Sequence, residues 1–160
     1  MSEVFWSWLG GFLGISAVGG MQMSWVSPSE GTMLIGSFGA SAILLYGVPT
    51  SPLAQPRNLL GGHVISALIG VLCVSLVPDP LWLSAALAVS VSLAVMHLTR
   101  TVHPPGGASA LIAVIGGPKI HALGFLYALV PVGLGALIML AVALLTNNLA
   151  KARRYPVFWF

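Results

Sequence analysis

The sequence predicts an all-α, polytopic membrane protein built from two repeats of long, short and long apolar segments. Charged residues make up 6% of its 160 residues and hydrophobic residues 58%, whereas a soluble domain carries about 25% charged residues. A soluble chain of this length could not cover its surface with so few charges. We therefore expect the whole chain, residues 1–160, to form a single membrane domain.

Six apolar segments follow one another and define the two repeats. They cover residues 4–25, 32–48, 59–77, 81–99, 105–117 and 120–149. A spanning helix needs roughly 20 residues to cross a core of ~30 Å, a length that the first, third, fourth and sixth segments reach. The second segment is marginal, and the fifth covers about two-thirds of the distance at ~1.5 Å per residue. The first repeat is expected over residues 4–78, the second over 80–149, and a basic tail over 150–160.

The distribution of basic residues favours six membrane crossings over four. With six, Lys119 lies on one side of the membrane, and the other side receives Arg57, Arg100, Lys151, Arg153 and Arg154. The positive-inside rule then places both termini in the cytoplasm of a cell membrane, inner or plasma. If segments 32–48 and 105–117 re-enter instead, the chain has four crossings, its halves run parallel, and this bias vanishes. We expect six segments with an incomplete fifth crossing, and the four-crossing alternative stays open.

A motif rich in small residues opens the fifth segment, and a shorter copy lies in the second. The motif is His103-Pro104-Pro105-Gly106-Gly107-Ala108-Ser109-Ala110, and its partial echo is Gly39-Ala40-Ser41-Ala42. Proline is favoured at a helix start, so the N–H groups of Gly106, Gly107 and Ala108 are expected to be free there. Free N–H groups at a helix N-terminus bind anions. Alternatively, the small residues let helices pack closely, and the sequence favours neither interpretation.

The linker before the third segment concentrates hydrogen-bonding groups. Asn58 is expected to be the N-cap of the helix that follows, and His63 to lie one turn into it. Arg57 offers a planar, permanently charged fork that suits an oxyanion, and its alternative role is an interfacial anchor. His63 joins the candidate site because an ionisable residue within a membrane helix is a functional candidate by default.

Several kinds of site are disfavoured. His97 and His103 lie six residues apart, so they would not share a helical face and give no metal signature. The acidic residues Glu3, Glu30 and Asp79 lie outside the cores of the long segments, whereas a cation path usually carries intramembrane carboxylates. No catalytic set of residues stands at a recognisable spacing. We therefore expect no enzyme, no cofactor and no nucleic-acid partner.

Three longer motifs follow one another along the chain. They are Ser51-Pro52 with Gln55-Pro56-Arg57-Asn58, Gly61-Gly62-His63 with Ile65-Ser66-Ala67, and His103-Pro104-Pro105 with Gly107-Ala108 and Ala110. With these motifs in this order, nearly the whole chain resembles the HPP family of small integral membrane proteins. The family is described as having four transmembrane helices, and plastid and cyanobacterial relatives are linked to nitrite transport. The resemblance therefore implies an anion transporter or channel, with nitrite as the candidate substrate.

Together these observations predict transport, or permeation through a channel, of a small monovalent anion across the lipid bilayer. The alternative function is a non-transporting membrane scaffold or assembly subunit. Glycine and alanine on lipid-facing surfaces favour close approach between subunits, so we expect a homo-oligomer, with a dimer favoured. The candidate substrate-binding residues are Gly39, Ser41, Gln55, Arg57, Asn58, His63, His103, Pro104, Pro105, Gly106, Gly107, Ala108 and Ser109.

Overall fold

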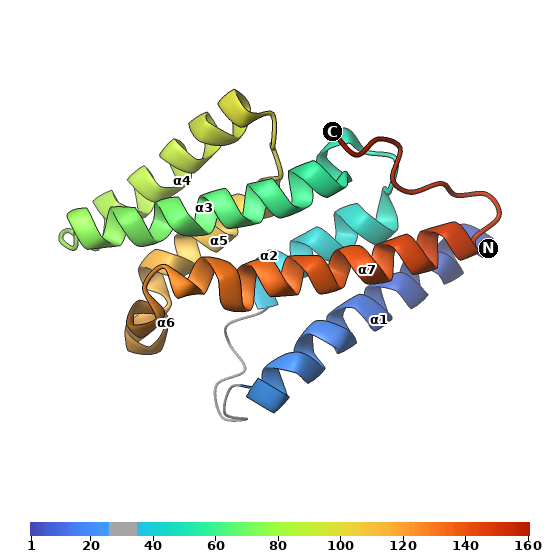
Figure 1. Cartoon of the computed structure of the whole chain (residues 1–160), viewed down its shortest axis with the longest axis horizontal. Coiled ribbons are helices and arrows are strands. Elements are labelled where there is room, and N and C mark those ends of the chain that lie inside the picture. Colours follow the sequence, from blue (N-terminus) through green and yellow to red (C-terminus); the bar gives the residue numbers. More distant parts are fainter. Residues whose placement is uncertain (26–34) are drawn as a thin grey trace.

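The computed structural model describes residues 1–25 and 35–160, so Glu30 and the start of the predicted 32–48 segment lie outside the described residues. Within these ranges the chain consists of helices joined by turns and loops, followed by an irregular C-terminal tail (Figure 1). The α-helices are α1 (Ser2–Trp25), α2 (Ile35–Ala42), α3 (Pro56–Leu76), α4 (Leu81–Thr99), α5 (Pro104–Ile115), α6 (Gly117–Leu123) and α7 (Leu134–Leu149). A π-helical turn extends α2 over Ile43–Gly47, and another precedes α7 over Ala128–Gly133. The predicted all-α membrane fold is confirmed.

The helices differ in length as the sequence predicts. Four are long and apolar enough to cross a membrane: Ser2–Met21, Pro56–Leu76, Leu81–Thr99 and Ala128–Leu149. The apolar helices Gly36–Gly47 and Pro104–Ile115 are shorter. The 12 residues of α5 span about 18 Å of a ~30 Å hydrocarbon core. The number of complete crossings therefore stays a prediction.

One end of the bundle gathers the chain termini and several helix ends (Figure 1). Arg153 Nη2 lies 2.8 Å from Glu3 Oε2, and Arg153 Nη1 donates to the Tyr46 carbonyl. Arg57 donates to the Thr99 carbonyl. These bonds bring the start of α1, the turn after α2, the start of α3 and the ends of α4 and α7 together. Successive long and short helices therefore reverse direction along the bundle.

The basic residues follow this arrangement. Lys119, in α6, lies at the opposite end of the bundle, whereas the end with the termini carries Arg57, Arg100, Lys151, Arg153 and Arg154. This is the separation expected for six alternating segments. Which side of a membrane each end faces stays a prediction.

Long helices from one half of the chain pack on long helices from the other half. Helix α1 of the first half packs on α7 of the second, and α4 of the second half packs on α3 of the first. The short helices α2 and α5 also pack on each other. Each half therefore contacts the other through a long helix and a short one, and the division into repeats at residues 78–80 stays a prediction.

The predicted cap of the third helix is wrong by three residues. The N-cap is Gln55, and α3 begins at Pro56, because proline is favoured in the first turn of a helix, where its missing N–H needs no partner. Asn58 lies within that first turn. Its side chain donates a hydrogen bond of 2.8 Å to the Val102 carbonyl instead of capping the helix.

The predicted sixth segment, residues 120–149, is divided in two. Helix α6 ends at Leu123, and Gly124 follows with a φ of 50°, a left-handed value that glycine adopts without a steric penalty. Val130 has non-helical dihedral angles before Pro131, because proline disfavours the helical conformation in the residue before it. The long helix of the second half therefore begins later than its hydropathy predicts.

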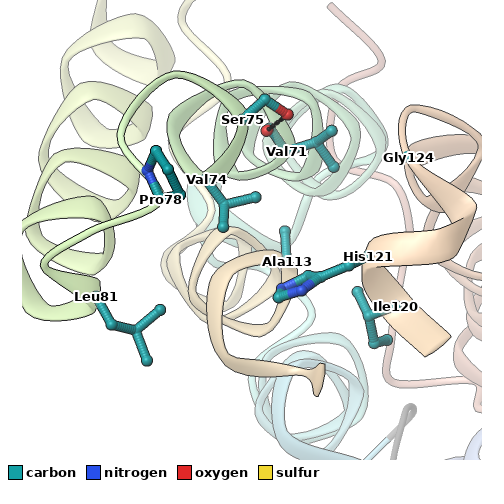
Figure 2. A pocket seen from close by; sticks show the side chains of 9 residues that line it. All are labelled: Val71, Val74, Ser75, Pro78, Leu81, Ala113, Ile120, His121 and Gly124. Carbon is teal, nitrogen blue, oxygen red and sulfur yellow. Dashed lines mark hydrogen bonds between the residues drawn. The ribbon is translucent and has the colours of Figure 1, made fainter. Parts of the chain in front are cut away.

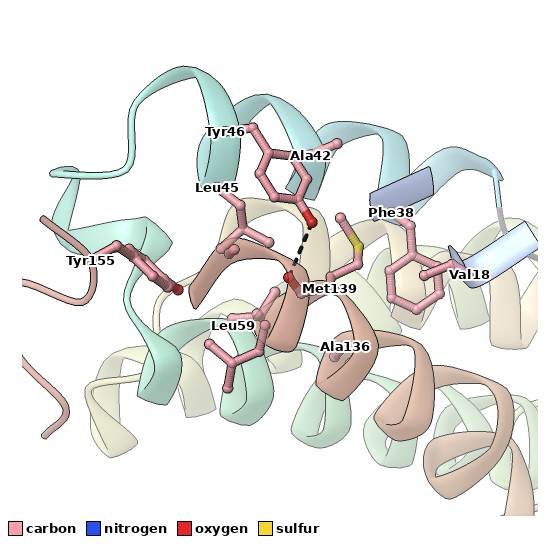
Figure 3. Close-up of a cluster of buried hydrophobic side chains, with 11 residues drawn as sticks. Val18, Phe38, Ala42, Leu45, Tyr46, Leu59, Ala136, Met139 and Tyr155 are labelled. Carbon is pink, nitrogen blue, oxygen red and sulfur yellow. Dashed lines mark hydrogen bonds between the residues drawn. The ribbon is translucent and has the colours of Figure 1, made fainter. Parts of the chain in front are cut away.

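A cluster of buried hydrophobic side chains packs α1 and α2 against α7 (Figure 3). Tyr46 is fully buried, and its hydroxyl donates a hydrogen bond of 3.1 Å to the Met139 carbonyl. On α1, Gly10 and Gly14 face the Tyr46 ring, and a Cβ atom at Gly10 would lie 2.7 Å from ring atom Cδ1. The ring thus lies directly against the α1 backbone.

We expect Gly14→Val to lower the free energy of unfolding by about 1–3 kcal/mol, the usual cost of overpacking a core. A Cβ atom at Gly14 would meet the hydroxyl and ring of Tyr46. Gly11→Val is the matched control, since a Cβ atom at Gly11 meets nothing within 4 Å and both variants change helix propensity in the same direction by a similar amount. Unfolding of both variants in one detergent is the measurement. Equal stability would contradict the packing of Tyr46 on α1.

Candidate functional site

A serine on α2 joins two histidines from other parts of the chain. Ser41 Oγ lies 2.7 Å from Nε2 of His63, on α3, and 2.8 Å from Nε2 of His103, which directly precedes α5. The centroids of the two imidazole rings are 4.9 Å apart. All three side chains are fully buried. Three of the predicted site residues therefore meet inside the bundle.

The outer nitrogens of both rings also have partners. His63 Nδ1 lies 2.7 Å from Ser109 Oγ on α5, and His103 Nδ1 lies 2.7 Å from the Leu53 carbonyl oxygen. The result is a continuous series of hydrogen bonds from Ser109 through His63, Ser41 and His103 to the Leu53 carbonyl, here called the histidine–serine chain. It joins α2, α3, α5 and the loop before α3.

The Leu53 carbonyl sets the direction of these hydrogen bonds when both rings are neutral. A carbonyl oxygen accepts, so His103 donates from Nδ1, and its Nε2 accepts from the Ser41 hydroxyl. Ser41 Oγ then accepts from His63 Nε2–H, and His63 Nδ1 accepts from the Ser109 hydroxyl. The two histidines therefore occupy opposite tautomers.

Glycines let α5 approach the backbone of α3 closely enough for these bonds to form. A Cβ atom at Gly106 would lie 2.5 Å from the Gly62 carbonyl oxygen, and one at Gly70 would lie 2.8 Å from Ala110 Cα. A Cβ atom at Gly62 would meet the His103 side chain. Of the two interpretations of the small residues, close helix packing holds for Gly106.

The N–H groups at the start of α5 are less available than predicted. Pro104 and Pro105 have no N–H, and the Gly106 N–H donates to the His103 carbonyl at 2.8 Å. Because α5 begins at Pro104, Ala108 is its fifth residue and lies beyond the turn in which helix N–H groups lack a partner within the helix. The expectation of free N–H groups at Gly106 and Ala108 is therefore wrong.

Gly39 and Gly107 lie apart from this close contact. A Cβ atom at Gly39 would meet nothing within 4 Å, and one at Gly107 would meet Val89 Cγ1 at 3.9 Å. Both positions therefore have room for a Cβ atom in the single chain, unlike Gly62 and Gly106.

Arg57 and Asn58 brace the segment that leads to His103. The Arg57 guanidinium donates a hydrogen bond of 2.6 Å to the Thr99 carbonyl at the C-terminus of α4, where the helix dipole favours a positive charge. Asn58 donates to the Val102 carbonyl at 2.8 Å. Asn58 is buried and Arg57 half-buried. Neither residue is hydrogen-bonded to the histidine–serine chain.

Gln55 connects the loop before α3 to the C-terminal tail. Its Nε2 donates to the Pro49 carbonyl at 3.0 Å and to the Ser51 carbonyl at 2.8 Å. Its Oε1 accepts from the Val157 N–H at 2.8 Å. The loop that presents the Leu53 carbonyl is thereby held in place.

Tyr155 adds a second contact between the tail and the same loop. Burial, with a smaller contribution from Tyr46, raises the pKa of the Tyr155 hydroxyl, so this group stays protonated. It donates to the Ala54 carbonyl at 2.7 Å. The tail therefore supports the site through the backbone of the loop.

Three groups at the site are not among the candidates predicted from the sequence. The Leu53 carbonyl carries no sequence signal, because every residue has one. The Tyr127 hydroxyl donates to the Ser109 carbonyl at 3.0 Å. Ser66 Oγ is buried near Gly106 and has no hydrogen-bond partner among the described residues. Ser66 lies three residues after His63, a spacing that puts both on one helix face and could have identified it.

A cavity of about 300 Å³ lies at the other end of the bundle (Figure 2). Its lining includes Val71, Val74, Leu81, Ala113, Ile120 and His121. His121 donates from Nε2 to the Val114 carbonyl at 2.9 Å. Val71 is about two turns of α3 beyond His63, so the cavity is separate from the histidine–serine chain. In the described part of the chain, no group of three or more His, Cys, Asp or Glu residues could hold a metal ion.

Fold and site together define a small polytopic membrane protein whose short helices carry buried polar residues. The chain belongs to the HPP family, since the family model of the HPP transmembrane region matches residues 1–156. Two transmembrane proteins of Dictyostelium discoideum are 47% and 45% identical to the chain over 163 residues. They match 100% of the chain, which covers 52% and 57% of their length. The chain thus spans about half the length of these curated relatives. No solved structure matches it.

We expect NMR of 15N-labelled histidines to show two different neutral tautomers in the site. His103 should be protonated on Nδ1, because that atom faces the Leu53 carbonyl, and His63 should be protonated on Nε2. Spectra of His63→Gln and His103→Gln protein would assign the signals. The same tautomer in both rings would contradict the direction of the histidine–serine chain.

Proposed function

We propose that this protein carries a small monovalent anion, with nitrite as the candidate, across the membrane. The observation that carries the proposal is the meeting of α2 and α5, the short helices of the two halves, around the histidine–serine chain. In transporters built from two similar halves, short or interrupted helices mark the central binding site. A buried set of imidazole and hydroxyl groups stands at that position here.

The placement of charges supports an anion over a cation. Glu3 is paired with Arg153 at one end of the bundle, and Asp79 lies in the turn between α3 and α4. No carboxylate of the described residues is hydrogen-bonded to the histidine–serine chain, whereas cation paths usually contain carboxylates. Arg57 has five N–H donors and gives one to the Thr99 carbonyl. The same guanidinium could hold an oxyanion beside the site.

Nitrite is the candidate because the resemblance to the HPP family implies it. The site itself does not distinguish nitrite from nitrate, formate or chloride. The Dictyostelium relatives are described as transmembrane proteins, and the chain covers about half of their length. Activity, substrate and partners are therefore proposals for this chain.

We also propose a homodimer in a cell membrane, with both termini in the cytoplasm. The end that holds both termini carries the basic residues that the positive-inside rule assigns to the cytoplasm. On α2 and the turn after it, Gly36, Ala40 and Gly47 are exposed in the single chain, and small residues permit close backbone approach of a second copy. Mass measurement in mild detergent and in lipid tests the assembly, and a monomer in both would contradict it.

A non-transporting scaffold or assembly subunit is the second candidate function, and one observation favours it. All four ring nitrogens of His63 and His103 already have hydrogen-bond partners. Fully satisfied polar networks can serve to specify a unique packing. Such a role needs stable folding and predicts no anion flux. We propose no enzymatic activity.

Nitrite flux into liposomes that contain the purified protein separates the two functions. Nitrous acid crosses bilayers unaided, so protein-free liposomes are measured at every pH and their flux is subtracted. A flux that saturates with nitrite and rises with protein content would support transport. Folded, inserted protein without flux of nitrite, nitrate, formate or chloride would favour the scaffold.

Arg57→Gln is expected to weaken apparent anion affinity by roughly ten- to hundredfold. A hydrogen bond to a charged group contributes about 1.5–3 kcal/mol, and ~1.4 kcal/mol corresponds to tenfold in affinity. Arg57→Lys should recover part of the affinity, because it keeps the charge and loses the planar fork. The concentration dependence of nitrite flux measures both effects.

Two controls separate anion binding from the structural contact that Arg57 makes with the Thr99 carbonyl. Thermal unfolding of Arg57→Gln protein measures the loss of that contact. Arg100→Gln removes an exposed positive charge directly after Thr99, and it should retain wild-type affinity. Wild-type affinity in correctly inserted Arg57→Gln protein would exclude Arg57 from the binding site.

A further inference from the structure

The histidine–serine chain can accept one additional proton without movement of its heavy atoms. His103 Nε2 and His63 Nδ1 are the accepting nitrogens of the two neutral rings. The Ser41 oxygen has two lone pairs, so it can accept from both Nε2–H groups at once. Proton uptake at His103 then requires rotation of the Ser41 hydroxyl and nothing larger.

Proton uptake at His103 is balanced in atoms and charge. The incoming proton forms an N–H bond at His103 Nε2, and no covalent bond breaks. The Ser41 hydroxyl hydrogen turns away from His103 Nε2, and the Ser41 oxygen then accepts from both rings. The site gains one proton and one positive charge.

The described residues around the site offer no negative charge to balance that proton. On α2, Phe38 is the ring neighbour of His63, with centroids 5.2 Å apart. Neither α5, the turn Ala128–Gly133 nor α7 contains a titratable residue. The Tyr127 hydroxyl donates to the Ser109 carbonyl at 3.0 Å.

The remaining neighbouring elements contribute positive or neutral groups. On α3, Arg57 precedes His63, and its positive charge lies against the Thr99 carbonyl. At the end of α4, His97 and Arg100 are exposed. The loop before α3 contributes the neutral side chain of Gln55. A protonated imidazole therefore lacks a carboxylate partner among the described residues.

An unpaired charge in a buried site is costly, whether it is a protonated imidazole or an anion. If the proton and the anion enter together, the site stays neutral overall. We therefore propose that the histidine pair bridged by Ser41 is the proton-binding site of an anion–proton symporter, which takes up one proton with each nitrite ion. This inference rests on the proposed function and adds its coupling ion.

Nitrite accumulation in liposomes under imposed gradients tests the coupling. An acidic exterior at zero membrane potential is expected to drive accumulation by the wild-type protein, since proton and anion enter together. A membrane potential at equal pH on both sides should not drive it, because the transported pair is neutral. Protein-free liposomes provide the background under each condition.

Three variants test whether the two histidines and Ser41 bind the transported proton. His63→Gln and His103→Gln retain hydrogen-bonding amides but cannot take up a proton near neutral pH, and Ser41→Ala removes the shared acceptor. Accumulation driven by the pH gradient should fall by roughly tenfold or more in each, within the usual range of coupling between two sites. Any remaining flux should respond to the membrane potential, because the anion then moves without its proton.

Two matched variants should keep the wild-type response. His121→Gln removes a histidine at the other end of the bundle, where its ring is bonded to the Val114 carbonyl. Ser37→Ala removes a buried serine one turn before Ser41 on the same helix. A loss of coupling in these variants equal to that in His103→Gln would overturn the assignment.

A measurement in detergent remains informative if the buried variants transport poorly. Nitrite added to weakly buffered wild-type protein should cause uptake of about one proton per bound ion, the number required for a neutral pair. Ser41→Thr keeps the hydroxyl and should retain this uptake. Equal uptake by His63→Gln, His103→Gln and wild-type protein would overturn the proposal.

The outcomes also distinguish the coupling from transport itself. Wild-type nitrite flux that follows the membrane potential and ignores the pH gradient would overturn the symport and leave anion transport standing. Wild-type protein that neither transports nor binds nitrite would overturn both proposals.

Discussion

The close backbone contact between α3 and α5 is the constraint on which the rest of the structure depends. Gly62 and Gly106 meet where a Cβ atom on Gly106 would lie 2.5 Å from the Gly62 carbonyl oxygen. At this separation Ser109 reaches His63, and His103 lies where it can face Ser41. A larger residue at either glycine would push the helices apart, and the hydrogen bonds between their side chains would lengthen beyond the range in which they stabilise.

The interior built on this contact is polar but neutral. Backbone and side-chain polar groups within a bilayer must find partners inside the protein, and the histidine–serine chain meets this demand by alternating rings and hydroxyls. Its last acceptor is the Leu53 carbonyl, whose loop is held by Gln55 and Tyr155. The C-terminal tail is thus part of the support of the site, although it lies outside the long apolar segments.

Local chemistry explains which parts of the fold could be predicted. The segment 81–99 coincides with α4, because apolar residues fill it and prolines precede it. The predicted start of α3 is wrong because Asn58 and Gln55 are both polar residues near its N-terminus, and Pro56 decides between them. Within the predicted sixth segment, the apolar composition continues across Gly124 and the kink at Val130, so hydropathy alone did not locate the break.

The sequence by itself determined that the protein lies in a membrane, that its segments alternate in length, and that Ser41, His63, His103 and Ser109 are candidates for its site. Composition and segment length are local properties, and bilayer thickness converts them directly into helices. The tertiary structure decided which candidates meet, that Gly106 serves helix packing, and that Arg57 contacts the end of α4. Those outcomes depend on the distance between α3 and α5 and on a loop carbonyl, and neither is encoded in the spacing of residues along the chain.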